Sequence, residues 1–330
     1  MQYCIGVDIS KNSFNAAVFD GEKILEDMVF DYTPEGINKF YEHVKDMDCL
    51  VVMEATGTYY LRLAEHLYHN SVKVSVVNPL IIKRFSEMRL KRTKTDKADA
   101  RIISRYGYSE KPDTFIPDTD NVKKIKLSAQ LIHDLIVTRT EYKNRLHALE
   151  NETIDTGQFV GHYLVLIETI NNEIKTLENS ITDLIKQEYP EEYEKVMAVP
   201  GVGQRTATVI FGYLKGFKNF ESAKQVISYI GTNPVEHRSG TSVKGKSHIS
   251  KKGSRYLRGV FYMSAVAAFQ FNPACRTFYL RLRSEGKPFK FAVIAVLNKL
   301  IKIIFAIVKN KRDYDPEYYV KISQKNMTFA

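Results

Sequence analysis

Four carboxylates in the first hundred residues carry the strongest chemical signal in this chain. Asp8 and Glu54 each close a short apolar run, which is typical of a buried strand that delivers its last carboxylate to the end of a sheet. Asp96 and Asp99 stand three residues apart, so they would share one face of a helix. Carboxylates gathered in this way repel one another unless a cation lies between them. Because hard oxygen ligands suit Mg²⁺ or Mn²⁺, the four acids predict a site for one of these metals.

The elements that must position these acids alternate as in an α/β domain. Three β-rich runs, at 3–8, 14–19 and 24–30, are separated by turn residues. Thr33-Pro34-Glu35 then combines a capping hydroxyl, a proline and an acid, which predicts the start of a helix. The other expected elements are a strand at 49–54, a helix near 58–69, a strand at 72–77 and a helix from Pro79. This order predicts the RNase H topology.

Charge is divided unevenly along the 330 residues. The length and the 44% hydrophobic content suffice for about two domains. Residues 196–330 hold 23 Lys and Arg against 6 Asp and Glu, whereas residues 1–195 hold 25 against 32. A strongly basic half joined to an acidic half that carries the predicted metal site indicates a nucleic-acid partner. The alternative is a basic enzyme whose charges are only solvated surface.

A basic stretch lies between the last expected strand and the acidic pair. Its members are Lys83, Arg84, Arg89, Lys91, Arg92, Lys94 and Lys97. Such a run is usually a solvated face, but here it adjoins the acids that a phosphate would have to approach, which favours phosphate contact.

Three features bear on the compartment. Cys4, Cys49 and Cys275 form no CxxC pair, so we expect reduced core thiols and neither zinc nor a disulfide framework. The N-terminus lacks a signal-peptide pattern. The apolar stretch from Phe289 to Val308 is interrupted by lysines and an asparagine, which favours a packed amphipathic helix over a membrane span. We expect a cytoplasmic protein with no membrane contact.

The middle of the chain is expected to be helical. One apolar seam steps by three and four through Ile167, Ile170, Ile174, Leu177, Ile181 and Leu184. A similar stripe consists of Leu127, Leu131, Leu135, Tyr142, Leu146 and Leu149. With a turn at 153–161 between them, the two predict an antiparallel helical hairpin, which could pair with another chain or pack only on its own domain.

Two glycine-containing segments follow. Pro200-Gly201-Val202-Gly203 is similar to a helix-hairpin-helix turn, in which backbone N–H groups approach a DNA phosphate. An ordinary helix–turn–helix packing could use the same glycines. Farther on, residues 238–258 are rich in Gly, Ser and basic residues, which is typical of a flexible phosphate-binding loop. A serine there is a poor nucleophile unless a base or a charged neighbour activates it.

Taken together, the acids, the Pro-Gly-x-Gly turn and the serine loop resemble one family. The matching motifs are the Asp8/Glu54/Asp96/Asp99 pattern, Val199–Gly203, Ser239-Gly240, Ile249-Ser250-Lys251-x-Gly253 and Leu257-Arg258. They occur in the order seen in the Asp-Glu-Asp-Asp transposases of the insertion-sequence one-ten type, and the resemblance spans nearly the whole chain.

The resemblance implies an architecture and a chemistry. The implied parts are a RuvC-like RNase H-fold domain at 1–115, a helical coiled-coil segment at 116–195 and a mainly helical C-terminal transposase domain at 196–330. It further implies a recombinase guided by a bridge RNA, in which Ser239 attacks donor and target DNA to form a phosphoserine link, with Ser242 as the fallback. The family architecture suggests that the acids of one subunit meet the serine of another in a dimer or tetramer, in a bacterial or archaeal nucleoid.

The nucleic-acid contacts expected on this basis are Arg89, Arg92, Lys94, Gly201, Gly203, Arg238, Lys244, Lys246, Lys251 and Arg258. Three alternatives stay open. A junction-resolvase type of metal nuclease would use the acids and water. An actin-like ATPase or sugar kinase would share the strand order and the early Asp8-Ile9-Ser10-Lys11. A non-catalytic nucleic-acid-binding protein would keep only the basic half.

Overall fold

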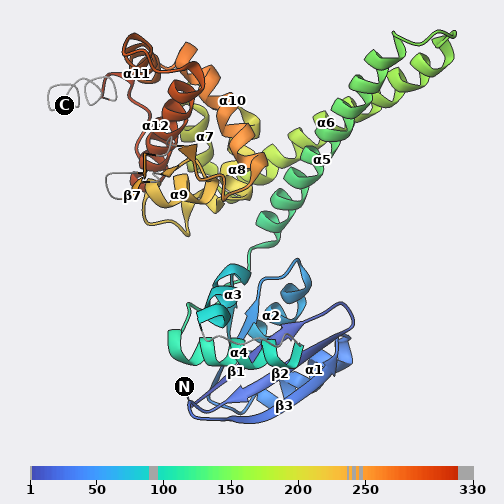
Figure 1. The fold of residues 1–330 in the computed structure, drawn as a ribbon, viewed down its shortest axis with the longest axis vertical. Coiled ribbons are helices and arrows are strands. Elements are labelled where there is room, and N and C mark those ends of the chain that lie inside the picture. Colours follow the sequence, from blue (N-terminus) through green and yellow to red (C-terminus); the bar gives the residue numbers. More distant parts are fainter. Residues whose placement is uncertain (1, 89–95, 236–237, 240–242, 245–247, 319–330) are drawn as a thin grey trace. The chain divides into compact units, whose positions relative to one another are not determined.

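The chain folds into two compact units, Met1–Pro117 and Asp118–Ala330 (Figure 1). The computed structural model describes residues 2–88, 96–235, 238–239, 243–244 and 248–318. The first unit combines a sheet with helices, and the second is mostly helical, as the sequence predicted.

The sheet of the first unit has five strands in the order β3-β2-β1-β4-β5. They are β1 (Tyr3–Ile9), β2 (Ser13–Phe19), β3 (Ile24–Asp31), β4 (Cys49–Glu54) and β5 (Lys73–Val77). The first three pair antiparallel, and β4 joins β1 and β5 in parallel. The predicted strands are therefore all present, with bounds within about one residue of those expected.

Helices cover both faces of this sheet. On one face lie α1 (Pro34–Val44) and α2 (Tyr59–His69), and on the other lie α3 (Pro79–Met88) and α4 (Asp96–Glu110). Alternate residues of a strand face opposite sides, so Ile5 packs toward α1 and α2 whereas Cys4 packs toward α3 and α4. The Thr33 hydroxyl accepts the Gly36 N–H at 3.2 Å, which is the predicted cap of α1.

Helix α4 packs directly onto the backbone of β1 through two glycines. A Cβ on Gly6 would lie 2.1 Å from the Ala100 carbonyl oxygen, and one on Gly107 would lie 2.5 Å from the Cys4 Sγ. Because the start of the helix faces Gly6 and its end faces Cys4, α4 runs antiparallel to β1. Its first turn therefore lies at the carboxyl end of that strand.

Replacing Gly6 by alanine is expected to destabilise the first unit by roughly 2 kcal/mol or more, because neither backbone can yield without moving the helix. Denaturant unfolding followed by circular dichroism measures the change. Gly161→Ala is the control, since its Cβ meets nothing within 4 Å and it lies inside a helix, where alanine is favoured. Unfolding of Gly6→Ala at the same denaturant concentration as the parent protein would contradict the close packing.

The second unit begins with a long antiparallel hairpin made of α5 (Asp120–Leu149) and α6 (Gly157–Glu188) (Figure 1). Helix α6 starts inside the segment expected to be a turn, with the Asp155 carboxylate accepting the Gly157 N–H at 2.9 Å. Ile174 and Ile181 on the predicted seam are buried in the core of this unit. The apolar residues of the seam are therefore buried by contacts within one chain.

The predicted stripe on α5 is wrong in its first half. Leu127 and Leu131 are 69% and 48% exposed, respectively. The buried face consists instead of Val122, Ile125, Ala129 and Ile132. Ile125 contacts α8 (Gln204–Gly212) at Gly212. A Cβ added to Gly212 would lie 3.0 Å from the Cγ2 of Ile125. Close approach of the two helices at this glycine selects the Ile125 face over the leucine face.

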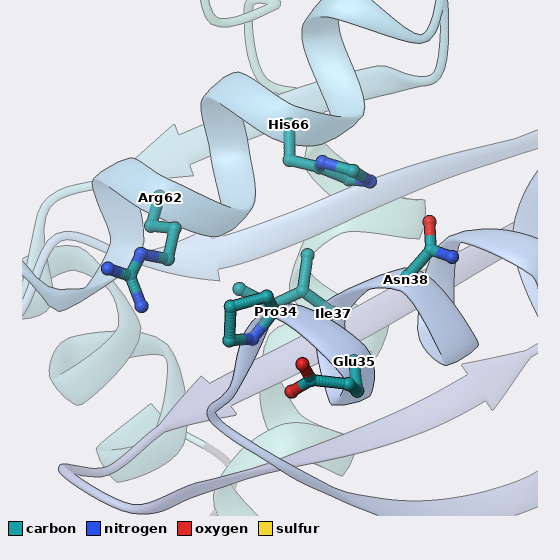
Figure 2. Close-up of a pocket in the computed structure, with 6 residues that line it drawn as sticks. All are labelled: Pro34, Glu35, Ile37, Asn38, Arg62 and His66. Carbon is teal, nitrogen blue, oxygen red and sulfur yellow. The ribbon is translucent and has the colours of Figure 1, made fainter.

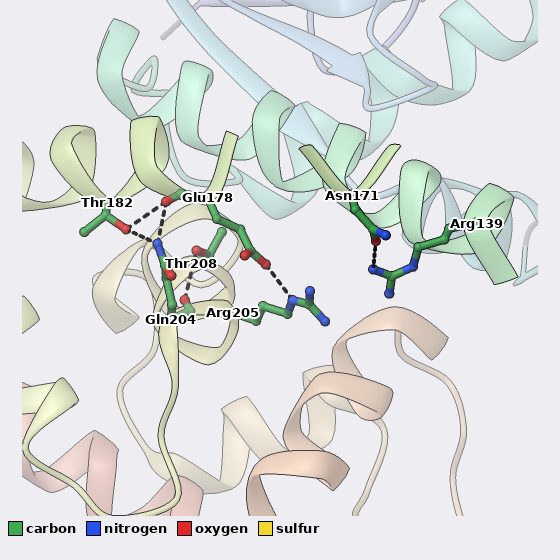
Figure 3. Close-up of polar contacts among 7 residues, drawn as sticks. All are labelled: Arg139, Asn171, Glu178, Thr182, Gln204, Arg205 and Thr208. Atoms are coloured by element: carbon green, nitrogen blue, oxygen red, sulfur yellow. Dashed lines mark hydrogen bonds and ion pairs between the residues drawn. The ribbon is translucent and has the colours of Figure 1, made fainter. Parts of the chain in front are cut away.

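Polar contacts attach the hairpin to α8 (Figure 3). The Gln204 side-chain amide donates to the Glu178 carbonyl oxygen and to the Thr182 hydroxyl, both on α6. Arg205 Nε donates to the Glu178 carboxylate at 2.7 Å. Farther along the hairpin, Arg139 of α5 donates to Asn171 of α6 at 2.8 Å.

As far as the structure describes it, the second unit contains six further helices besides the hairpin and α8, and four short strands that are given with the candidate site. The helices are α7 (Pro190–Met197), the short η1 (Lys215–Phe217), α9 (Ala223–Ile230), α10 (Arg255–Phe271), α11 (Pro273–Ser284) and α12 (Phe289–Asn310). Within the described part of the chain, α12 alone is long and apolar enough to cross a membrane. Its apolar face, including Val296, Leu300 and Ile304, is fully buried among the other helices, as the sequence predicted for a packed helix.

Candidate active site

Two of the predicted acids lie side by side at the end of the sheet. The register of the parallel β1–β4 pair places Asp8 beside Glu54. Both project to the side on which Cys4 and Val52 pack, which is the side covered by α3 and α4. Both residues are half-buried. The Glu54 carboxylate accepts the Thr56 hydroxyl at 2.7 Å, which restrains its orientation.

The other two acids begin the helix that covers this side. Asp96 and Asp99 stand in the first turn of α4, where the positive end of the helix dipole favours carboxylates. Because α4 runs antiparallel to β1, this turn and Asp8 lie at the same end of the strand. Asp99 is half-buried and Asp96 is exposed. The structure therefore brings all four acids to one face of the sheet, at the end where β1 and β4 finish.

An ion-pair network that the sequence did not indicate fastens α4 to the sheet. Arg101 donates to the Asp27 carboxylate of β3 through Nε, at 2.8 Å, and through a second guanidinium nitrogen. Lys97 Nζ lies 3.3 Å from the same carboxylate. These contacts, led by Arg101, hold the pKa of Asp27 below its ordinary value. The partners are 74 residues apart, so no spacing rule links them.

The residue types suit a divalent metal, since four carboxylates are the hard oxygen donors that Mg²⁺ and Mn²⁺ prefer. The geometry is less complete. Among residues 2–88, 96–235 and 248–318, no three acidic, histidine or cysteine side chains lie close enough together to hold one ion. The four acids thus occupy one region without defining a coordination sphere.

The predicted nucleophile belongs to a β-ribbon on the second unit. Its described strands form two antiparallel pairs, β6 (Pro234–Val235) with β9 (His248–Ile249), which we call its base, and β7 (Arg238–Ser239) with β8 (Val243–Lys244). Ser239 is the last residue of β7 and pairs with Val243 of β8. The fallback, Ser242, lies outside the described residues, as do Arg89, Arg92, Lys94 and Lys246.

The base of this ribbon is held by hydrogen bonds to the end of α9. The Lys251 N–H donates to the Gly231 carbonyl oxygen at 3.0 Å. Arg258 Nη1 donates to the carbonyl oxygens of Ile230 and Gly253 at 3.2 and 2.5 Å. The guanidinium of Arg258 therefore fastens the ribbon base to α10, while the exposed side chain of Lys251 has more freedom to meet a phosphate.

The Pro-Gly-x-Gly turn joins α7 to α8. Gly201 has φ +98°, and an added Cβ would lie 2.6 Å from the Ala268 Cα, so packing against α10 alone requires glycine there. Gly203 is exposed at the start of α8 with open space around it. Gly201 is half-buried, so of the two glycines Gly203 has the more open backbone for a phosphate to approach.

A separate pocket lies between α1 and α2 (Figure 2). Pro34, Glu35, Ile37, Asn38, Arg62 and His66 line it. The His66 Nε2 is buried without a hydrogen-bond partner. This pocket is on the opposite face of the sheet from Asp8 and Glu54, so it does not contribute to the candidate site.

An RNase H-like sheet with acids at one edge, followed by a basic helical unit, defines a class of DNA strand-transfer enzymes. Residues 5–153 match the DEDD transposases of the IS110 type, and residues 193–280 match the transposases of the IS116/IS110/IS902 family. The chain belongs to the IS110 family of transposases. It is an enzyme of DNA transposition and recombination.

Curated relatives align with most of this chain and over most of their own length. A pilin gene-inverting protein of Moraxella bovis is 32% identical over 94% of this chain and 97% of its own length, and its counterpart in Moraxella lacunata is 31% identical over the same shares. The transposase for insertion sequence element IS1111A of Coxiella burnetii is 23% identical over 94% of this chain and 90% of its own length. These matches make an ATPase, a sugar kinase or a non-catalytic binding protein untenable.

Proposed function

We propose that this transposase cuts and rejoins DNA through a phosphoserine intermediate formed by Ser239, with Asp8, Glu54, Asp96 and Asp99 holding Mg²⁺ or Mn²⁺. The observation that carries the proposal is the placement of the four acids on one face of the sheet, where β1 and β4 end. Transposases of this class usually use a divalent metal. Bound there, the metal would neutralise charge on the phosphate during transfer.

In the proposed step the Ser239 hydroxyl gives up its proton and its oxygen bonds to phosphorus. The bond from phosphorus to the leaving DNA oxygen breaks, and that oxygen takes up a proton. Because the ester keeps the bond energy, strands are rejoined without ATP. The runner-up is a metal nuclease that uses water, which would leave the serine ribbon as a DNA contact.

A guide RNA and a homo-oligomer are part of the proposal. The net positive charge of residues 196–330 would attract both RNA and DNA, and a bridge RNA would supply the sequence recognition by base pairing. Leu164, Val165 and Leu166 on the outer part of the hairpin are exposed and could meet a second copy. The decisive experiment is to incubate the protein with labelled donor and target DNA, with and without RNA transcribed from beside its gene.

Affinity for DNA is expected to fall steeply with salt. Each phosphate neutralised by a lysine or arginine contributes about −0.9 to the slope of log affinity against log salt on duplex DNA. Fluorescence anisotropy over a salt series measures the slope, and Lys251→Gln should make it shallower by about one such contribution. Asp46→Asn, an exposed acid of the first unit, is the control that should leave it unchanged. A flat salt response would mean that the basic residues are solvated surface.

A second candidate function is site-specific inversion of a DNA segment. Two relatives that match 94% of this chain bear the name pilin gene-inverting protein. Inversion uses the same cutting and rejoining chemistry on two sites of one molecule. A plasmid in which two candidate sites flank a reporter segment distinguishes the two outcomes, because inversion flips the segment whereas transposition moves the element elsewhere.

A further inference from the structure

The turn between α11 and α12, together with the first residues of α12, exposes two phenylalanines in a basic surrounding. Every residue from 283 to 291 is exposed. The exposed fractions of Phe289 and Phe291 are 44% and 52%, and Leu280, one helical turn before this segment, is 55% exposed. Single exposed apolar residues are ordinary, but two rings within three positions at the start of α12, next to a charged turn, call for an explanation.

The charge around these rings is almost entirely positive. Residues 273–312 contain ten Lys and Arg and a single acid, Glu285. The acid pairs with Arg281 at 3.8 Å. In the part of the chain that the structure describes, no carboxylate pairs with Lys287 or Lys290. The Lys287 ammonium lies 6.0 Å from the centroid of the Phe291 ring, so positive charge adjoins an aromatic face.

The Phe289 ring is held in place from behind. Phe269 of α10 and Tyr279 of α11 stack with centroids 4.3 Å apart. Phe289 meets both edge to face, at 6.3 and 6.4 Å. Such a ring loses little conformational freedom when a partner covers its outer side. Residues two apart do not share a helix face, so Phe289 and Phe291 would each meet a different group.

We propose that this turn binds unpaired bases of single-stranded DNA, with Phe289 and Phe291 stacking on two bases and Lys287 and Lys290 attracting the phosphates between them. Aromatic faces among basic residues recognise single strands, because base faces are hidden in a duplex. A protein partner fits less well, because lysines are depleted in the core of protein interfaces. The enzyme acts on DNA, whose strands must part when they are cut and exchanged.

The test compares Phe289→Ala/Phe291→Ala with the parent protein by anisotropy on single-stranded DNA, duplex DNA and single-stranded RNA of one sequence. We expect affinity for single-stranded DNA to fall about ten-fold or more, the loss typical of one or two stacked bases. Duplex affinity should change less than about two-fold. The salt slope should stay the same, because every charge is retained. Phe159→Ala, a phenylalanine equally exposed at 52% on the hairpin, should leave all three affinities unchanged.

Lys287→Gln/Lys290→Gln separates charge from stacking, since it should lower the salt slope on single strands by about 0.7 per lost contact. Equal losses on single and duplex DNA, or a loss confined to RNA, would overturn the proposal. So would a change of oligomeric state in sedimentation with single-strand affinity intact, which would make this surface a contact between copies. If the double variant loses its helical circular dichroism, Phe291→Ala alone carries the comparison. Only binding is measured, so failure here would leave the proposed roles of Ser239 and the acids untouched.

Discussion

Ser239→Ala should lose both strand cleavage and the covalent protein–DNA adduct, with a fall in rate of roughly 10³-fold or more. A site built to place a serine oxygen in line with the leaving oxygen does not readily accept water in its place. End-labelled DNA on denaturing gels shows the adduct as a shifted band that protease removes. The fold should be unaffected, because Ser239 is the last residue of the two-residue strand β7.

Ser242→Ala is the matched control for this experiment. It removes a hydroxyl three residues away in the sequence, and it should keep part of both cleavage and adduct. Cleavage by Ser239→Ala at the parent rate, with no shifted band from any variant, would identify the protein as a metal nuclease that uses water. Loss of the band in Ser242→Ala alone would move the nucleophile to that residue.

Asp8→Asn is expected to reduce cleavage by roughly 10²-fold or more while nucleic-acid binding changes little. The substitution keeps the size of the side chain but removes the charge that a divalent metal needs at the end of β1. Cleavage should be measured over a range of Mg²⁺ and Mn²⁺ concentrations, and binding by anisotropy on the same DNA. Asp46→Asn serves as the control, since Asp46 is an exposed acid after the end of α1, away from the sheet edge.

Full recombination by Asp8→Asn would remove the acids from the mechanism. A loss of binding that parallels the loss of cleavage would instead give Asp8 a structural role. Glu54→Gln should behave like Asp8→Asn, because the register places the two residues side by side. The Thr56 hydroxyl would still donate to the side-chain oxygen of the introduced amide, so the orientation of that side chain is kept and only its charge is lost.

Much of the local structure could be predicted because its causes lie close together in the sequence. The alternation of short apolar runs predicted every strand of the sheet, and Thr33-Pro34 predicted the cap of α1. Acids at the ends of two apolar runs predicted that Asp8 and Glu54 would meet at one edge, since parallel neighbours end together. The uneven charge of the two halves likewise needed only counting.

Contacts between distant segments were decided by the tertiary structure alone. Helix α4 brings Asp96 and Asp99 to the end of β1 because Gly6 lets the helix backbone pack directly on that strand. The ion pair between Arg101 and Asp27 then holds the helix in this position. Helix α5 has two apolar stripes. The one with Ile125 is buried because Gly212 of α8 allows a close contact there, and Leu127 of the other stripe is exposed to solvent. Periodicity reports which residues could be buried, but the choice between faces depends on the shape of the partner surface, and that surface exists only once the chain has folded.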